Sequence, residues 1–183
     1  MRKVLLASIL LVGIVYLPGL VAAQKKAYPD SSPLLFEPDY HNHGLENARP
    51  PSDDILDALL KKVEADELSS EIEDLSREQK RALFEIVRVN LGPPAEGDYV
   101  VHGKPPMIGA DCEWFWVVRV KQGKAEVILF ANGLALELRR QMVNGYREIG
   151  VSWATAAYVG DRLYRYEGPV YKLVRDRTRE QQP

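Results

Sequence analysis

The stretch AEVILFANGLALELRRQMVNGYREIGVSW, residues 125–153, decides the fold because its apolar and polar residues alternate along much of its length. Side chains on a β-strand point to opposite faces in turn, so this alternation is typical of strands with one buried face. It places Leu134, Leu136 and Leu138 on the same face. Asn144-Gly145 interrupts the pattern, and this dipeptide readily adopts the positive φ of a tight hairpin turn. We therefore expect two antiparallel strands that meet at this dipeptide.

The same pattern extends from Asp98 to about residue 175. Short runs rich in Val, Ile, Trp and Tyr are separated by turn-sized gaps, which read KQGKA, NG, VNGY, VGD and GP. Because each gap is short enough for a hairpin, consecutive strands are expected to pair antiparallel. The sequence therefore predicts an antiparallel meander of about six strands.

Two amphipathic helices are expected before this meander. The first begins after Ser52, a favourable N-cap, and the second begins after Ser76, where Gln79 completes a capping box. Apolar residues recur at helical spacing, as Ile55, Leu56, Leu59, Leu60 and Val63 in the first helix and Leu83, Phe84, Val87 and Leu91 in the second. Two N-terminal helices packed on one face of the meander predict an α+β fold.

Composition divides the chain into four parts. Residues 1–23 combine a basic start, an uncharged apolar run and small residues at the end, which is the pattern of a signal peptide. Residues 24–51 are Pro-rich without apolar periodicity and are expected to form a linker. Residues 52–175 are expected to form a single α+β domain, and residues 176–183 a flexible C-terminal tail. Cleavage would leave no stable membrane anchor and predicts an extracytoplasmic protein, periplasmic or secreted, whereas an uncleaved segment of ~20 residues could span a bilayer.

Composition also narrows the function. The formal net charge of -2, with 27% charged residues, gives no overall basicity and argues against nucleic-acid binding. Cys112 is the single cysteine, so no intramolecular disulfide can form and the domain must be stabilised by packing. The sequence contains no zinc-protease, P-loop or dinucleotide-binding motif, and we expect neither a cofactor nor a metal.

The Asn-Gly corner has two functional interpretations. Calcium takes ~6–8 oxygen ligands, and this arginine-flanked stretch offers too few, so a calcium loop is rejected. A binding corner fits better, because tyrosine and arginine are enriched at binding hot spots. Tyr146 and Arg147 follow the turn and are expected to be exposed, with Arg165 and Tyr166 nearby in the sheet. These four residues form the predicted binding site.

Two motifs carry a resemblance to a known group of proteins. NGYREIGVSW, residues 144–153, contains an Asn-Gly-Tyr-x-Glu corner, and YRYEGPVYK, residues 164–172, contains Tyr-Arg-Tyr-Glu-Gly-x-x-Tyr. Together with an upstream stretch that includes Asp111, Cys112, Trp116 and Val117, they resemble a pattern in uncharacterised exported bacterial proteins. The resemblance covers about residues 98–174 and implies an extracytoplasmic β-rich domain without an assigned reaction. Comparable sequences often carry a second cysteine in an upstream Gly-rich loop, but the stretch HGKPPMIGADC of this chain has none, so any disulfide in that loop is absent here.

Two functions remain open at this point. The first is an exported non-catalytic binding or structural module that contacts an unknown protein or envelope component. The second is a small extracytoplasmic hydrolase or thiol enzyme, with Cys112 as nucleophile and His102 as base. No particular residue suggests itself as the group that would orient such a base, which favours the module.

We predict that the exported protein begins at Gln24, because cleavage after Ala23 follows a run of small residues. Intact-mass analysis of periplasmic or secreted material measures the new N-terminus directly. A mass that includes residues 1–23 would show that the apolar segment is retained as an anchor.

Overall fold

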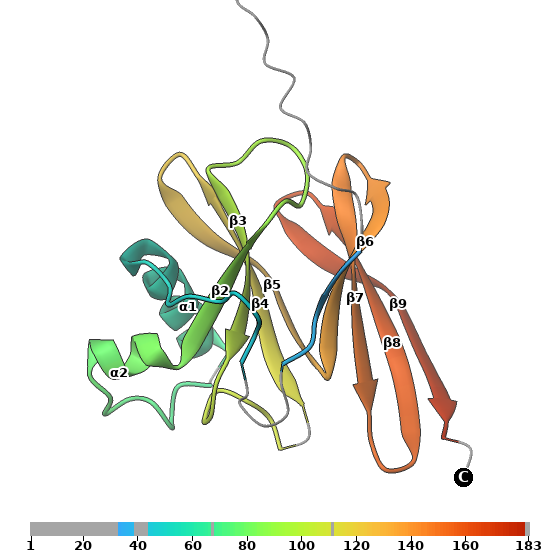
Figure 1. Ribbon diagram of the computed structural model, residues 1–183, viewed down its shortest axis with the longest axis horizontal. Coiled ribbons are helices and arrows are strands. Elements are labelled where there is room, and N and C mark those ends of the chain that lie inside the picture. Colours follow the sequence, from blue (N-terminus) through green and yellow to red (C-terminus); the bar gives the residue numbers. More distant parts are fainter. Residues whose placement is uncertain (1–32, 39–43, 67, 111, 182–183) are drawn as a thin grey trace, which may run out of the picture.

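The computed structural model describes residues 33–38, 44–66, 68–110 and 112–181. The predicted signal peptide and half of the predicted linker lie outside these residues. The described part of the chain contains nine strands and two helices (Figure 1). No helix within it is long and apolar enough to cross a membrane.

The strands form two antiparallel sheets. The five-stranded sheet has the order β1-β6-β7-β8-β9, and the four-stranded sheet has the order β2-β3-β4-β5. The first sheet contains β1 Leu34–Phe36, β6 Ala135–Val143, β7 Tyr146–Ala154, β8 Tyr158–Glu167 and β9 Val170–Glu180. The second contains β2 Phe84–Val89, β3 Gly97–Gly103, β4 Glu113–Lys121 and β5 Lys124–Gly133. The helices are α1 Asp53–Ala65 and α2 Arg77–Ala82.

The predicted α+β fold, with two N-terminal helices on a meander of about six strands, is wrong. The described chain is mostly β, with two sheets and only two short helices. Helix α1 lies where the first helix is predicted, but α2 ends at Ala82 and residues Phe84–Val89 form β2. Phe84 and Ile86 pack toward α1, and Val87 packs toward the other sheet. A strand covered on both faces has no strict polar alternation, so its apolar spacing also fits a helix.

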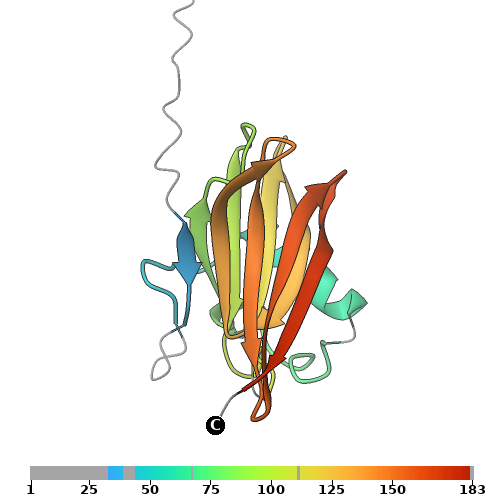
Figure 2. The same ribbon diagram turned by 90° about the vertical axis from the view of Figure 1, so that its right-hand side faces the viewer.

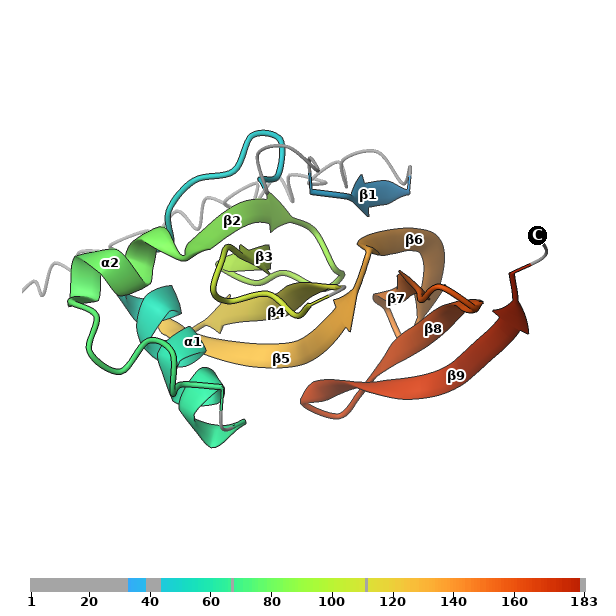
Figure 3. The same ribbon diagram turned by 90° about the horizontal axis from the view of Figure 1, so that it is seen from below.

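The molecule has three layers, which Figures 1 and 3 show as α1, the four-stranded sheet and the five-stranded sheet. The four-stranded sheet is in the middle, which explains why every residue of β3 is buried. One apolar core joins this sheet to the helical layer and includes Leu56, Leu59, Val63, Trp116 and Val118. A second core fills the space between the sheets and includes Val100, Phe115, Val117, Leu136, Leu138, Ile149 and Val151.

The chain passes from one sheet to the other at Gly133 and Leu134, between β5 and β6. A side chain at Gly133 would place its Cβ 2.4 Å from the carbonyl oxygen of Ser152, so only glycine fits this crossing. Leu136 and Leu138 then face the core between the sheets and are fully buried, as the alternation predicts. Leu134 lies in the crossing itself and remains 44% exposed.

Both ends of the described chain contain more strand than the sequence predicts. β1 falls inside the predicted linker, where Leu34 lies opposite Leu138 and Phe36 lies opposite Leu136. β9 continues to Glu180, so residues 176–180 of the predicted flexible tail are strand. β1 is only three residues long, and the end of β9 is strongly charged, so neither shows a clear apolar pattern.

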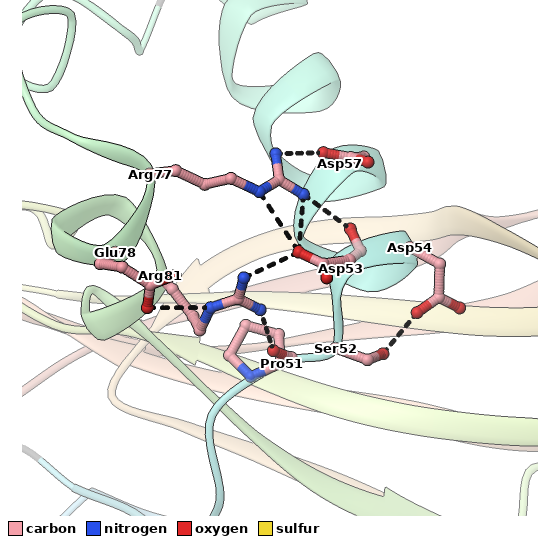
Figure 4. A network of polar contacts seen from close by, with 8 residues as sticks. All are labelled: Pro51, Ser52, Asp53, Asp54, Asp57, Arg77, Glu78 and Arg81. Carbon is pink, nitrogen blue, oxygen red and sulfur yellow. Dashed lines mark hydrogen bonds and ion pairs between the residues drawn. The ribbon is translucent and has the colours of Figure 1, made fainter.

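Exposed ion pairs tie the start of α1 to α2 (Figure 4). Arg77 places Nη1 2.7 Å from Asp57 Oδ1 and Nη2 2.9 Å from Asp53 Oδ1. Arg81 Nη2 lies 2.7 Å from the same Asp53 oxygen, and its Nη1 donates to the carbonyl oxygen of Pro51 at 2.8 Å. Hydrogen bonds from Arg81 and Arg77 lower the pKa of Asp53. Because these groups are at the surface, dissolved salt weakens their attraction.

We predict that Leu138→Ala lowers the free energy of unfolding by about 2–5 kcal/mol, because the fully buried leucine would leave a cavity. Leu134→Ala removes the same atoms from a half-exposed position and is the matched control, with a cost below about 1 kcal/mol. Urea denaturation of both variants measures the two losses. Equal losses would contradict the assignment of Leu138 to the core between the sheets.

Candidate functional site

The β6–β7 hairpin turn forms one end of the sandwich. Asn144 has a φ of 53° and Gly145 a φ of 81°, which confirms the predicted Asn-Gly turn. The loop after β2 packs against this turn, since a side chain at Gly92 would place its Cβ 2.3 Å from the Gly145 carbonyl oxygen. The N–H of Arg147 also donates to the carbonyl oxygen of Leu91 at 2.8 Å. The turn is therefore held in place by a loop from the four-stranded sheet.

Three tyrosines gather beside this turn. The rings of Tyr146 and Tyr166 stack with centroids 3.9 Å apart and an interplanar angle of 24°. Tyr171 meets Tyr166 edge-on at 5.4 Å, and its hydroxyl donates to the carbonyl oxygen of Arg147 at 2.9 Å. Tyr171 is buried, whereas Tyr146 and Tyr166 are partly exposed. The two stacked rings therefore present a fixed aromatic surface to solvent, which we call the tyrosine corner.

A buried cation lies against the tyrosine corner. The guanidinium carbon of Arg119 is 4.8 Å from the ring centroid of Tyr146 and 5.9 Å from that of Tyr166. Arg119 Nε is 2.9 Å from Asp98 Oδ1, and its Nη2 donates to the carbonyl oxygen of Pro93 at 2.9 Å. Arg119 and Asp98 are 7% and 4% exposed. Strands β3 and β4 of the four-stranded sheet thus position the cation that contacts the tyrosine rings of the five-stranded sheet.

Burial is the largest influence on the pKa values of Asp98, Arg119, Tyr166 and Tyr171. It raises the pKa of Asp98, even though Arg119 acts in the opposite direction. Burial lowers the pKa of Arg119, but Asp98 and Tyr146 outweigh it, so the pKa lies above its ordinary value. Burial and the neighbouring Tyr146 raise the pKa of Tyr166, and burial likewise raises that of Tyr171. The guanidinium therefore stays charged, and Tyr166 and Tyr171 keep their hydroxyl protons at neutral pH.

The structure brings together only part of the predicted binding site. Tyr146 and Tyr166 are in contact, but Arg147 is 7% exposed and not the exposed side chain that its place after the turn predicts. The adjoining loop, which binds its backbone, covers this part of the strand. Arg165 points away from Tyr166, because neighbours on a strand face opposite sides. It pairs instead with the buried carboxylate of Glu148 at 2.6 Å.

The sequence interpretation missed Asp98 and Arg119. Arg119 lies in the apolar run EWFWVVRVK, on the same sheet face as Phe115 and Val117. A charged residue on an apolar face needs a partner when it is buried. Asp98, at a similar place in the neighbouring run, lies directly opposite it. Attention to charges inside apolar runs could have found this pair.

His102, the base of the proposed thiol enzyme, lies at the other end of the core between the sheets. Its ring is fully buried, with Nδ1 3.1 Å from Glu85 Oε1 and Nε2 2.9 Å from Glu113 Oε2. Both ring nitrogens are therefore already within hydrogen-bond distance of a carboxylate, so the imidazole is held in a polar network and not presented as a free base. Burial raises the pKa of Glu85, but hydrogen bonds from His102, the Leu45 N–H and Lys104 outweigh it, so the pKa is lowered. The arrangement is that of a buried structural network.

Metal binding finds no support in the described part of the chain. No three His, Cys, Asp or Glu side chains there gather closely enough to hold a metal ion. The tyrosine corner presents two aromatic rings with phenolic hydroxyls, and a buried cation supports them.

We predict that Glu85→Gln lowers the free energy of unfolding at pH 7 by about 1–3 kcal/mol, because His102 and Lys104 lose a buried anionic partner. The folded pKa of Glu85 lies below its ordinary value of 4.5. Its carboxylate therefore stabilises the fold above that pH, and this contribution is lost as the pH falls through the folded pKa. Denaturation curves should show the gap between wild type and variant shrinking in acid.

Glu126→Gln is the matched control for this prediction. Lys124 also lowers the pKa of Glu126, but this pair is exposed. The control is expected to change stability little at any pH. A constant gap for Glu85→Gln between neutral and acid pH would contradict the assigned role of Glu85.

Comparisons with known proteins give neither a family nor a function for this chain. The predicted resemblance to exported bacterial proteins stays a prediction, and function has to be inferred from the described contacts. No protein-family model, curated protein or solved structure matches the chain.

Proposed function

We propose that this protein is an exported, non-catalytic binding module that contacts a protein or another component of the cell envelope through the tyrosine corner. The observation that carries the proposal is the stacked pair of Tyr146 and Tyr166, partly exposed and backed by Arg119. Export is inferred from the pattern of residues 1–23 alone.

The geometry of the corner favours affinity. Aromatic side chains contribute much of the binding energy of protein interfaces, with tyrosine, tryptophan and arginine the most enriched types. Here the stack between Tyr146 and Tyr166 and the contact with Arg119 already fix both rings. Little side-chain entropy would be lost when a partner covers them, so more of the contact energy would appear as affinity. Relative to the site predicted from sequence, the proposal keeps the tyrosines and replaces the two arginines with Arg119.

The described contacts argue against the thiol-enzyme alternative. A base for Cys112 would need an imidazole nitrogen that can accept a proton. The nitrogens of His102 already lie within hydrogen-bond distance of Glu85 and Glu113, inside the protein. The module is therefore the better-supported function.

We predict that Tyr146→Ala and Tyr166→Ala each abolish capture of the partner while the domain remains folded. Loss of the ring stack costs about 0.5–1.5 kcal/mol beyond the lost burial, so the melting temperature should fall only modestly. The measurement is a quantitative pull-down from envelope extract with the mature chain, together with a thermal melt of each variant.

Tyr158→Ala is the matched control, because Tyr158 is 44% exposed and lies at the start of β8, at the opposite end from the stacked rings. It should retain the partner. Tyr146→Phe removes the hydroxyl but keeps the ring stack, so it distinguishes the contribution of the hydroxyl to capture from that of the ring. Retention of the same partner by Tyr146→Ala and Tyr166→Ala would mean that the tyrosine corner is not the contact surface.

A further inference from the structure

Strand β9 forms an open edge of the five-stranded sheet. It is last in the strand order and pairs only with β8, from Val170 opposite Glu167 to Glu180 opposite Tyr158. Figure 2 shows β9 at the edge of this sheet, and Figures 1 and 3 both show its C-terminal end diverging from β5. Along this part of β9, no other strand of the described chain covers the second side of the backbone.

A bulge sets the direction of the charged side chains on β9. Leu173 lies opposite Tyr164 and Arg175 lies opposite Leu163, so Val174 is an extra residue without a partner. Without the bulge, residues 172 and 175 would face opposite sides. With it, the four basic residues of β9 all lie opposite positions of β8 on the face away from the four-stranded sheet, and they are Lys172, Arg175, Arg177 and Arg179. These four residues form a cationic row along the outer face of β9.

The positive charge on this face is concentrated at its edge. Two arginines on inner strands of this sheet have acidic partners, with Arg139 3.3 Å from Glu137 and Arg165 2.6 Å from Glu148. In the cationic row, Asp161 pairs with Arg175 at 3.1 Å, and Glu167 lies 3.8 Å from Lys172. Arg177 and Arg179 are exposed and make no ion pair with any described residue.

We infer that β9 accepts an additional strand from a partner polypeptide, and that this strand carries Asp or Glu at every second position. An open edge offers backbone groups to an extended chain, as in other cases of strand addition. Residues directly opposite in paired strands share one face and interact, so alternating acids would meet the cationic row. Exposed Leu173 and Val174 offer apolar contact at the other end of the same edge.

The cationic row also opposes pairing of two copies of this protein. A two-fold axis at Arg177 would set Arg175 opposite Arg179 of the other copy, and Arg177 opposite itself. Like charges directly opposite one another are destabilising, and charged residues on edge strands commonly prevent self-association. An acidic strand meets no such repulsion. This surface is separate from the tyrosine corner, so the inference does not depend on the function proposed there.

The test uses the mature chain and a fluorescent synthetic peptide of about ten residues, the length of a long strand, in which Glu alternates with Val or Thr. Fluorescence anisotropy measures its affinity. One control peptide has the same composition with its Glu residues in a single block, and another is N-methylated along its backbone. Both controls should bind at least tenfold more weakly, because the first misplaces the charges and the second cannot donate backbone hydrogen bonds.

The matching protein variant is Arg177→Glu with Arg179→Glu, which should weaken binding of the alternating peptide about tenfold or more at low salt. Arg140→Glu is the control, since Arg140 is exposed on β6 without an ion pair among the described residues. It should bind nearly as wild type, as should Tyr146→Ala. Thermal melts confirm that each variant is folded.

Several results would overturn the inference. Equal binding of the blocked peptide would indicate general attraction to a polyanion. Equal binding of the N-methylated peptide would exclude strand addition. Unchanged affinity in the Arg177→Glu and Arg179→Glu variant, or an equal loss in Arg140→Glu, would show that the cationic row is not the contact. Failure of the alternating peptide to bind wild type would also reject it.

Discussion

The buried ion pair between Asp98 and Arg119 is the interaction on which the arrangement of the tyrosine corner depends. Both groups lie between the sheets, where an unpartnered charge would cost several kcal/mol. At the other end of the same space, His102 lies between two carboxylates. β3 therefore carries a polar residue at each end of an apolar stretch, and β4 supplies a partner at each end, with Glu85 of β2 as a second partner of His102. A slip of one residue would turn these side chains to the wrong face, so the polar ends fix the register of the two strands.

The tyrosine corner and the cation behind it are brought together by the packing of the two sheets. Tyr146 and Tyr166 belong to the five-stranded sheet, whereas Arg119 belongs to the four-stranded sheet. The two sheets are joined by the crossing at Gly133, where no side chain fits. Neither sheet alone would present stacked rings above a cation. The corner therefore forms only when the sandwich is closed, and its shape reports whether the core between the sheets is intact.

Local patterns predicted local structure well and long-range contacts poorly. The alternation in residues 125–153 and the Asn-Gly dipeptide correctly predicted two strands and their turn. β2 was missed because α1 covers one face and the other sheet covers the second, which removes the polar alternation that marks a strand. Arg147 is buried, and its N–H donates to the carbonyl oxygen of Leu91, more than fifty residues away in sequence. Such partners leave no trace in the spacing of neighbouring residues.

The bulge at Val174 shows that the pairing of a strand can decide which of its charged side chains share a face. Deleting this one residue would leave the net charge of the protein unchanged. It would also leave Lys172 and the three arginines on one side of the strand, because Lys172 and Arg175 would then be two positions apart in a regular alternation. If Val174 were instead retained and paired regularly with β8, Lys172 would face the opposite side from the three arginines, so the same residues would present a different charged face. That difference lies in the pairing of β9 with β8, and comparison of residue composition alone would not reveal it.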